Sequence, residues 1–259
     1  MKKTINLLLE KIKSILQDNF MSYYLYGSIV NKDYRHGWSD IDFICFTNRP
    51  VDESVAEQLL MLRQKMLEIY PKNKYFRKFE GIFISLQAYL NNEKEKIVYW
   101  GTSGQKIKDG HNIDVFAKYE LKHSSVLISG RNIGNEFVEP TFDELKNAIY
   151  KHYNSIREHA VTTDASLYSC GWLLDISRCL YTLKYKKVIS KTKAGEWAIK
   201  NNVCPVKKDL KKTIKVRKKP LRYKEKKEIK SWLCNLGQNV QEYANILEQC
   251  LTNFCNINN

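Results

Sequence analysis

Two spacings of hydrophobic residues divide the first 90 residues into predicted helices and strands. Apolar side chains recur every three or four positions in residues 3–18 and 52–69, which is the spacing of an amphipathic helix. Residues 23–26, 41–46 and 79–90 are instead rich in aromatic and β-branched residues, which is typical of strands. Because helices and strands alternate, this part of the chain is predicted to form an α/β domain.

The rest of the chain is irregular up to residue 139 and then helical. Thr141 and Glu144 follow Pro140 with the spacing of a capping box, in which each side chain bonds a free backbone N–H at the start of a helix. Helical spacing then continues over residues 141–159, 166–186, 192–201 and 225–255. We therefore expect an α+β protein, with a mixed-sheet N-terminal domain at residues 1–138 and an all-helical C-terminal domain at residues 139–259.

Composition excludes several classes of protein. Hydrophobic residues make up 43% of the 259 residues, which is too many for a disordered chain. No apolar run reaches the roughly 18 residues of a membrane-spanning helix, and Glu10 and Lys11 interrupt the first apolar stretch, so no signal peptide is expected. The number of cysteines is odd and no pair has the spacing of a zinc site, so we expect reduced thiols and a cytoplasmic protein. The seven cysteines are Cys45, Cys170, Cys179, Cys204, Cys234, Cys250 and Cys255.

Positive charge is concentrated in one segment. The formal net charge is +15, and residues 205–230 hold 13 Lys or Arg against three acidic residues, which gives this segment a charge of +10. Such an excess is compatible with an anionic partner or with simple solubility. Because a nucleic-acid groove usually draws its charge from several elements, we interpret the segment as a solvated loop or mobile arm with short helical pieces.

A pattern of small and acidic residues indicates phosphate chemistry. Gly27 and Ser28 follow the first predicted strand, where a glycine allows close approach to a phosphate and a serine can donate hydrogen bonds to it. Asp40 and Asp42 are two positions apart at the start of the next strand, so their carboxylates share one face and suit a divalent cation such as Mg²⁺. Glu80 begins an otherwise apolar strand and is the candidate third carboxylate.

This pattern resembles the signature of the polymerase-β-like nucleotidyltransferase superfamily, whose paired aspartates hold Mg²⁺ and a nucleoside triphosphate. Among its members, the chain is most similar to the bacterial aminoglycoside adenylyltransferases that inactivate spectinomycin and streptomycin. Three further segments resemble that family: the strand that starts at Phe79-Glu80, residues 122–130 (KHSSVLISG) and residues 190–198 (SKTKAGEWA). The resemblance covers about residues 20–200, and the remainder agrees in helical character alone.

The resemblance implies roles for individual residues. Asp40 and Asp42 would bind Mg²⁺, and Glu80 would accept the proton of a drug hydroxyl that attacks the α-phosphorus of ATP. Because a cationic drug needs an acidic pocket, acidic residues are expected to attract it. The residues expected to contact ATP are Gly27, Ser28, Ser39, Arg178 and Lys191, and those expected to contact the drug are Trp100, Asp164 and Asp175. The basic segment would either bring Lys215 or Arg217 near the nucleotide or remain a soluble arm, which we favour.

The expected function is transfer of AMP from ATP to O-9 of spectinomycin, which confers antibiotic resistance. Streptomycin, modified at O-3″, is disfavoured because Tyr168 replaces an aspartate of the streptomycin-modifying enzymes and His159 stands roughly where they carry a tryptophan. Two alternatives remain: a nucleotidyltransferase that acts on RNA or protein, and a catalytically silent nucleotide-binding module. We expect a monomer that binds neither a membrane nor nucleic acid.

Overall fold

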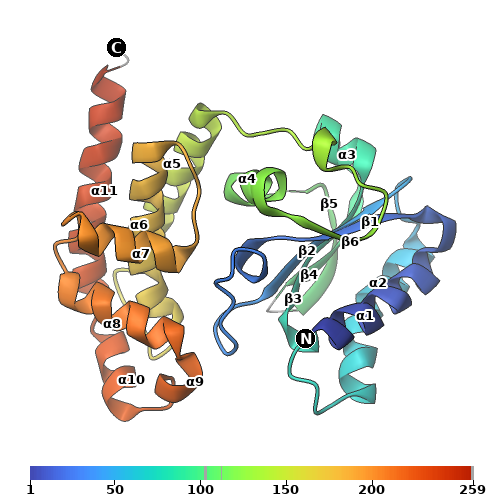
Figure 1. Ribbon diagram of the computed structural model, residues 1–259, viewed down its shortest axis with the longest axis horizontal. Helices are drawn as coiled ribbons and strands as arrows, with labels where there is room; N and C mark the ends of the chain where they lie inside the picture. Colours follow the sequence, from blue (N-terminus) through green and yellow to red (C-terminus); the bar gives the residue numbers. More distant parts are fainter. Residues whose placement is uncertain (102–103, 112, 258–259) are drawn as a thin grey trace. The chain divides into compact units, whose positions relative to one another are not determined.

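Figure 1 shows the computed structural model of the chain, which describes residues 1–101, 104–111 and 113–257. Side chains are described up to residue 253, so the thiol of Cys255 lies outside the described residues. The chain forms two compact units. The first comprises Met1–Lys32 and Ser39–Glu139, and the second, called the helical unit below, comprises Asp33–Trp38 and Pro140–Asn259. Residues 33–38 therefore belong to the helical unit, although they lie early in the sequence.

The first unit is built on a mixed sheet. Within the described residues its six strands have the order β5-β4-β3-β2-β1-β6. β2 and β3 are parallel, and the other neighbouring pairs are antiparallel. The expected mixed sheet is thus confirmed. The strands are β1 (Phe20–Leu25), β2 (Ile41–Thr47), β3 (Phe79–Ser85), β4 (Lys96–Gly101), β5 (Gly104–Asp109) and β6 (Val126–Gly130).

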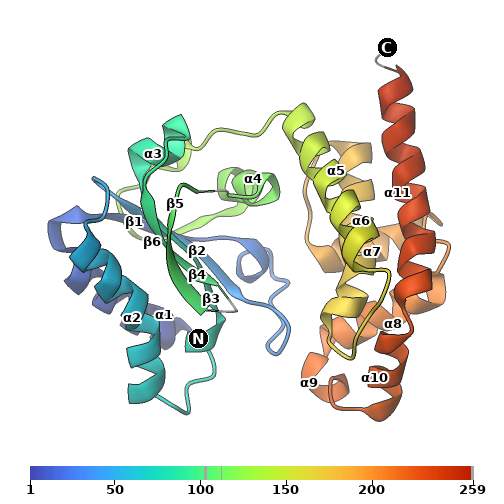
Figure 2. The same ribbon diagram turned by 180° about the vertical axis from the view of Figure 1, so that it is seen from behind.

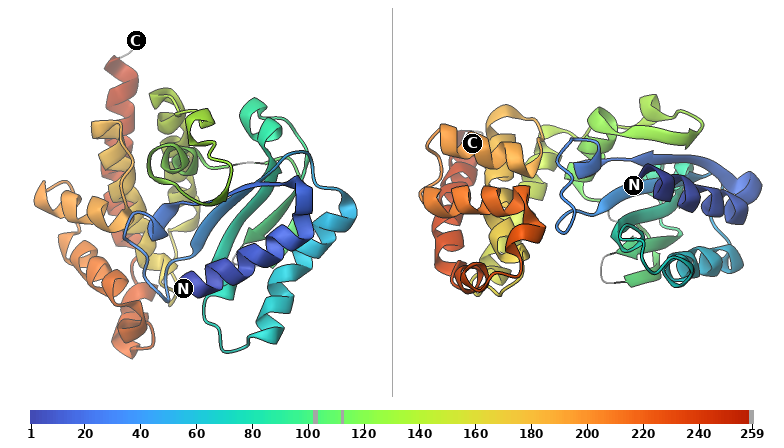
Figure 3. Two further views of the ribbon diagram at one scale, coloured as in Figure 1. Left: turned by 45° about the vertical axis from the view of Figure 1, so that its right-hand side comes forward. Right: turned by 60° about the horizontal axis from the view of Figure 1, so that its bottom comes forward.

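Alternate residues of the central strands face opposite sides of the sheet. α1 (Lys2–Leu16) and α2 (Glu53–Ile69) lie side by side against one face (Figures 1 and 3). Phe43 points to this face, where its ring packs on Tyr23 and Trp100. Ile44 points to the other face, into a core that it shares with residues of α3 (Leu86–Asn91) and α4 (Val115–Ser124). This alternation decides which face each polar residue of a strand occupies.

The helical unit is a bundle in which α5, α6 and α11 run side by side (Figure 2). Its first helix begins with the predicted capping box: Thr141 Oγ1 accepts a hydrogen bond from the Glu144 amide, and the Glu144 carboxylate accepts one from the Thr141 amide. α7 and α8 pack against α6. The helices are α5 (Phe142–His159), α6 (Tyr168–Tyr185), α7 (Lys191–Lys200), α8 (Lys207–Lys218), α9 (Pro220–Tyr223), α10 (Lys227–Cys234) and α11 (Gly237–Ile257).

The predicted strand at residues 79–90 is too long. β3 ends at Ser85, whose hydroxyl accepts a hydrogen bond from the Ala88 amide and thereby caps α3. Residues 91–139, which look irregular in sequence, contain β4, β5, α4 and β6. β5 was not predicted because it is a partly exposed edge strand with the polar sequence GQKIKD, which lacks the apolar alternation of a half-buried strand.

The basic segment at residues 205–230 is not a mobile arm. It forms α8, α9 and α10, and α8 buries one face while its lysines cover the other. Arg217 is only 3% exposed. The helix predicted over residues 225–255 is divided into α10 and α11 at Asn235 and Leu236. The many lysines mask the apolar spacing of α8, which is why the sequence favours a solvated segment.

Two further observations concern the cysteines and the hydrophobicity of the helices. None of the described cysteines forms a disulfide. Among the described helices, none is long and apolar enough to cross a membrane.

Candidate active site

Asp42 and Glu80 lie next to each other on the two parallel strands. In the register of β2 and β3, Asp42 is paired with Glu80, and Ile41 is paired with Phe79. Ile41 and Phe79 are fully buried in the core. Because successive side chains of a strand alternate, the two carboxylates point to the opposite face of the sheet. Asp40 immediately precedes β2 and is close enough to raise the pKa of Glu80.

Gly27 brings the chain directly against Asp42. Its φ of +70° lies in the left-handed region that favours glycine, and a Cβ at this position would clash with Oδ2 of Asp42. The amide of Tyr26 donates a hydrogen bond of 3.2 Å to the Asp42 carbonyl. The next residue, Ser28, has a buried hydroxyl with no hydrogen-bond partner among the described residues. Since a buried polar group without a partner is unusual, this hydroxyl is suited to donate to a bound phosphate.

A cavity of about 210 Å³ lies over these carboxylates, entirely within the first unit. Among the described residues that line it, three are acidic and one, Lys108, is a cation. The cavity therefore favours a positively charged guest. Its lining residues are Tyr26, Asp42, Ile44, Glu80, Gly81, Ile82, Tyr99, Lys108, Ile113, Asp114 and Ala117.

Glu80 has the properties of a general base. Burial raises the pKa of its carboxyl above the ordinary value, and a hydrogen bond from the Tyr99 hydroxyl opposes this by favouring the charged form. That bond is 2.7 Å long. Burial also raises the pKa of Tyr99 to about 12, so the phenol stays protonated and remains the donor. A carboxylate of raised pKa is a stronger base, which suits proton abstraction near neutral pH.

Asp40 is paired with a cation, Lys78. Its Oδ1 lies 3.4 Å from Nζ of Lys78. Burial raises the pKa of Asp40, and Lys78 acts in the opposite direction. The preceding residue, Ser39, is 6% exposed. Lys78 thus balances part of the negative charge that the carboxylates bring together.

These residues fit a divalent cation that is shared with a triphosphate. Among the described residues, no group of three His, Cys, Asp or Glu side chains is arranged to hold a metal ion. Mg²⁺ is usually bound by one or two carboxylates together with substrate phosphates. Asp40 and Asp42 supply such a pair, and the Ser28 hydroxyl offers a donor for the phosphates. The donor set suits Mg²⁺ that arrives with a nucleotide.

Within the helical unit, Asp175 forms ion pairs with both cations that were expected to contact ATP. Nζ of Lys191 lies 2.7 Å from Oδ1 of Asp175, and a guanidinium nitrogen of Arg178 lies 4.0 Å from the same oxygen. Although burial alone would raise the pKa of Asp175, Lys191 and Arg178 hold it below its ordinary value. Lys191 and Arg178 are thus ion-pair partners of Asp175, and its contact with a drug stays a prediction.

Trp100 is not placed for the expected contact with a drug. Its side chain is fully buried on the α2 side of the sheet, opposite the cavity. Its indole N–H donates a hydrogen bond of 3.1 Å to the Leu59 carbonyl. The ring also packs on Phe43 and Phe83. The strand alternation that aims Tyr99 at the cavity aims Trp100 at the core, so the expected substrate role is not supported.

Asp164 lies in the connection between α5 and α6, within the helical unit. Its carboxylate accepts hydrogen bonds from the Ser166 amide and the Ser169 hydroxyl, and these bonds lower its pKa. Asp164 therefore stabilises the local turn, and its contact with a drug stays a prediction.

Four side chains of this site were missed in the sequence. Tyr26, Tyr99 and Asp114 line the cavity, Asp114 from the N-cap position of α4, and Lys78 pairs with Asp40. Lys78 stands only two residues before Glu80, and this short spacing could have identified it as a residue of the site. Tyr26 directly precedes Gly27 of the motif, whereas Tyr99 and Asp114 depend on the pairing of β3 with β4 and on the position of α4, which no local pattern reveals.

Family models match both parts of the chain. Residues 9–123 match the model of a nucleotidyltransferase domain, and residues 142–249 match that of the aminoglycoside adenylyltransferase C-terminal domain. No curated protein sequence matches the chain. Among solved structures, the chain is similar to the spectinomycin adenyltransferase AAD(9) from Enterococcus faecialis, crystallised with ATP and spectinomycin. The TM-score is 0.70 and the identity 17%, over 96% of this chain and 99% of that chain. At this identity, the likeness shows a common fold.

Proposed function

The chain belongs to the aminoglycoside adenylyltransferases, a family of nucleotidyltransferases, and we propose that it transfers AMP from ATP to the O-9 hydroxyl of spectinomycin. One observation carries the proposal: Asp42 and Glu80 are paired on β2 and β3, beside the turn that holds Ser28, whose buried hydroxyl has no hydrogen-bond partner in the described part of the chain. A candidate base therefore lies next to candidate ligands for a metal and a phosphate. The similar structure contains ATP and spectinomycin, which supports this choice of substrates.

The residues proposed to contact ATP are those that the resemblance to the family implies. Gly27, Ser28 and Ser39 would hold the phosphates through backbone and hydroxyl donors. Arg178 and Lys191 would neutralise phosphate charge, in exchange for part of their pairing with Asp175. Mg²⁺ held by Asp40 and Asp42 would neutralise the triphosphate and the departing pyrophosphate.

Glu80 would act as the base. Its carboxylate accepts the proton of the drug hydroxyl, whose oxygen forms a bond to the α-phosphorus as the bond from that phosphorus to the pyrophosphate oxygen breaks. Tyr99 fixes the orientation of the carboxylate through its hydrogen bond. The products are the adenylylated drug and pyrophosphate.

The cavity beside Glu80 would receive the amino group of the drug. Asp42, Glu80 and Asp114 line it, so a cationic amine is attracted and an anionic acceptor is repelled. We propose Asp114 as the drug contact, in place of Trp100. Streptomycin remains the less favoured acceptor, since Tyr168 occupies the position of the aspartate in the streptomycin-modifying enzymes.

A screen of aminoglycosides with ATP and Mg²⁺ tests the proposal directly. We expect mass spectrometry to detect spectinomycin carrying one added adenylyl group, and we expect Asp114→Asn to raise the KM for spectinomycin while leaving that for ATP unchanged. Lys108→Met is the matched control, because it removes the cation of the same cavity and should not raise the KM for the drug. Absence of a nucleotide adduct on every aminoglycoside would refute the proposed function.

A further inference from the structure

The segment Asp33–Trp38, called the strap below, joins Ser28 to Asp40 in the sequence but packs within the helical unit. Asp33 and Arg217 meet there although they are 184 residues apart in sequence. Both are 3% exposed. A buried pair of this kind is costly to form unless its remaining hydrogen-bonding groups are also satisfied.

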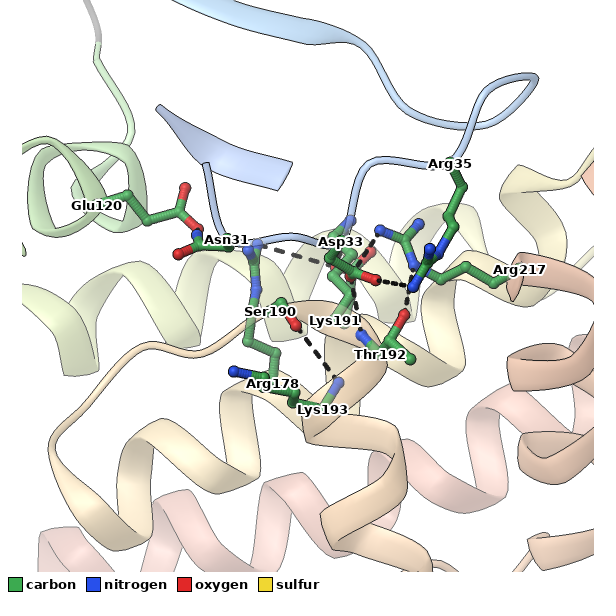
Figure 4. Close-up of polar contacts among 11 residues, drawn as sticks. Asn31, Asp33, Arg35, Glu120, Arg178, Ser190, Lys191, Thr192, Lys193 and Arg217 are labelled. Atoms are coloured by element: carbon green, nitrogen blue, oxygen red, sulfur yellow. Dashed lines mark hydrogen bonds and ion pairs between the residues drawn. The ribbon is translucent and has the colours of Figure 1, made fainter. Parts of the chain in front are cut away.

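The first turn of α7 satisfies further groups of the pair (Figure 4), whereas Oδ1 of Asp33 has no hydrogen-bond partner among the described residues and lies 3.6 Å from a guanidinium nitrogen of Arg35. Oδ2 of Asp33 accepts a hydrogen bond of 3.0 Å from Arg217 and one of 3.2 Å from the Thr192 amide. Nε of Arg217 donates to Oγ1 of Thr192 at 3.1 Å. The three residues therefore form a closed triangle. The carboxylate also lies at the N-terminus of α7, where a negative charge is favourable.

Further contacts hold the strap in place. The Arg217 guanidinium lies 5.2 Å from the centre of the Trp38 ring. Gly37 has a φ of +92°, and a Cβ there would lie 2.6 Å from a methyl group of Leu221. Only glycine fits this position without displacing the leucine. These contacts therefore restrict the conformation of the strap at several of its residues.

We propose that Asp33 is a positioning residue for Lys191. Lys191 is the first residue of α7 and directly precedes Thr192, whose amide and hydroxyl are both held by the Asp33–Arg217 pair. Fixing this turn fixes the origin of the lysine side chain, which extends to Asp175 at 2.7 Å. The inference rests on the proposed function, in which Lys191 binds a phosphate of ATP.

A purely structural pair would behave differently. It would stabilise the fold, and its loss would lower the melting temperature without any specific link to Lys191. A positioning role predicts instead that the contributions of Asp33 and Lys191 to ATP affinity depend on each other, because one acts through the other.

A double-mutant cycle on the full chain measures this dependence. Calorimetry with ATP and Mg²⁺ gives the Kd for the unmodified chain, Asp33→Asn, Lys191→Ala and the double variant. We expect each single substitution to weaken binding by about tenfold, and the double variant to be no more than about twofold weaker than Lys191→Ala. Should Asp33→Asn not fold, Asp33→Asn combined with Arg217→Gln leaves no unpaired buried charge and gives the same cycle.

Arg157→Gln is the control. Arg157 bonds Gln241, Asn245 and Glu248 within the same unit, so this substitution should lower the melting temperature but leave the Kd for ATP unchanged. The inference is overturned if the double variant has the Kd expected from multiplying the two separate losses of ATP affinity. It is also overturned if Asp33→Asn does not change the Kd for ATP. Adenylylation of spectinomycin is measured separately, so its absence contradicts the proposed function whereas independent effects contradict the positioning role.

Discussion

The Tyr99 hydroxyl donates a hydrogen bond of 2.7 Å to Oε1 of Glu80. The bond holds the carboxylate in one orientation and favours its charged form, which is the form that accepts a proton. We predict that Tyr99→Phe lowers kcat by about tenfold, which corresponds to the lower end of the roughly 1.5–3 kcal/mol that a hydrogen bond to a charged group contributes. Glu80→Gln, which removes the base, should lower kcat by about 100-fold or more.

Release of pyrophosphate from ATP in the presence of spectinomycin measures both changes. Tyr150→Phe is the control, because this tyrosine is 55% exposed on α5 and should tolerate the same loss of a hydroxyl. A Glu80→Gln variant with nearly normal kcat would show that another group takes the proton.

A substitution of Gly27 tests whether ATP binding requires the close approach of the backbone to Asp42. In Gly27→Ala the new methyl group displaces the Asp42 carboxylate, and the left-handed backbone adds a strain of about 1–2 kcal/mol. We expect the affinity for ATP with Mg²⁺ to fall by at least tenfold while the fold is retained, as judged by circular dichroism and calorimetry. Gly134→Ala is the control, since Gly134 does not have a positive φ and the nearest atom to its Cβ, at 3.3 Å, is Oδ1 of the Asn132 side chain. Equal affinity in the two variants would mean that the turn adapts.

The sequence reveals the parts of the site that are local. Asp40 and Asp42 are two positions apart at the start of a buried strand, so strand alternation predicts that their carboxylates share one face, whereas the position of Glu80 beside Asp42 also depends on the parallel pairing of β2 and β3. The capping box at Thr141 is equally local and is confirmed. The Asp40–Asp42 spacing and the capping box each depend on residues only a few positions apart.

The features that were not predicted depend on distant pairing. Tyr99 reaches Glu80 only through the register of β3 and β4, and Asp33 meets Arg217 across most of the chain. Arg217 looks like one more cation of a lysine-rich segment, and nothing in its neighbours indicates that it is buried. Burial and partner choice are set by packing of the whole unit, which hydrophobic spacing does not encode residue by residue.

A substitution of Trp100 distinguishes a structural role of this residue from a role in substrate binding. Trp100→Phe removes part of a fully buried ring and leaves the Leu59 carbonyl without its indole donor. The expected loss of stability is about 1–3 kcal/mol, from the cavity and the lost hydrogen bond. Because the ring lies on the side of the sheet opposite the cavity, the KM for spectinomycin should not change. Urea denaturation and steady-state kinetics check the two expectations, and a higher KM at unchanged stability would restore Trp100 as a drug contact.

Asp175 links the stability of the helical unit to pH. Lys191 and Arg178 hold its pKa in the folded protein below the ordinary value, against the effect of burial. A carboxyl group with a lowered pKa binds its proton less tightly in the folded than in the unfolded chain. Its contribution to stability is therefore fully present above the unfolded pKa of about 3.9 and is lost as the pH falls through the lower, folded value.

We expect Asp175→Asn to lower the free energy of unfolding at pH 7, because it removes the negative charge that pairs with Lys191 and Arg178. The difference between this variant and the unmodified chain should shrink as the pH falls below about 4, since the wild-type carboxyl then becomes neutral as well. Urea denaturation of the ATP-free proteins at a series of pH values measures the difference. Glu196→Gln is the control, because its ion pair with Lys218 is half exposed and contributes little. A difference that stays constant down to the lowest pH would show that the charge of Asp175 does not stabilise the fold.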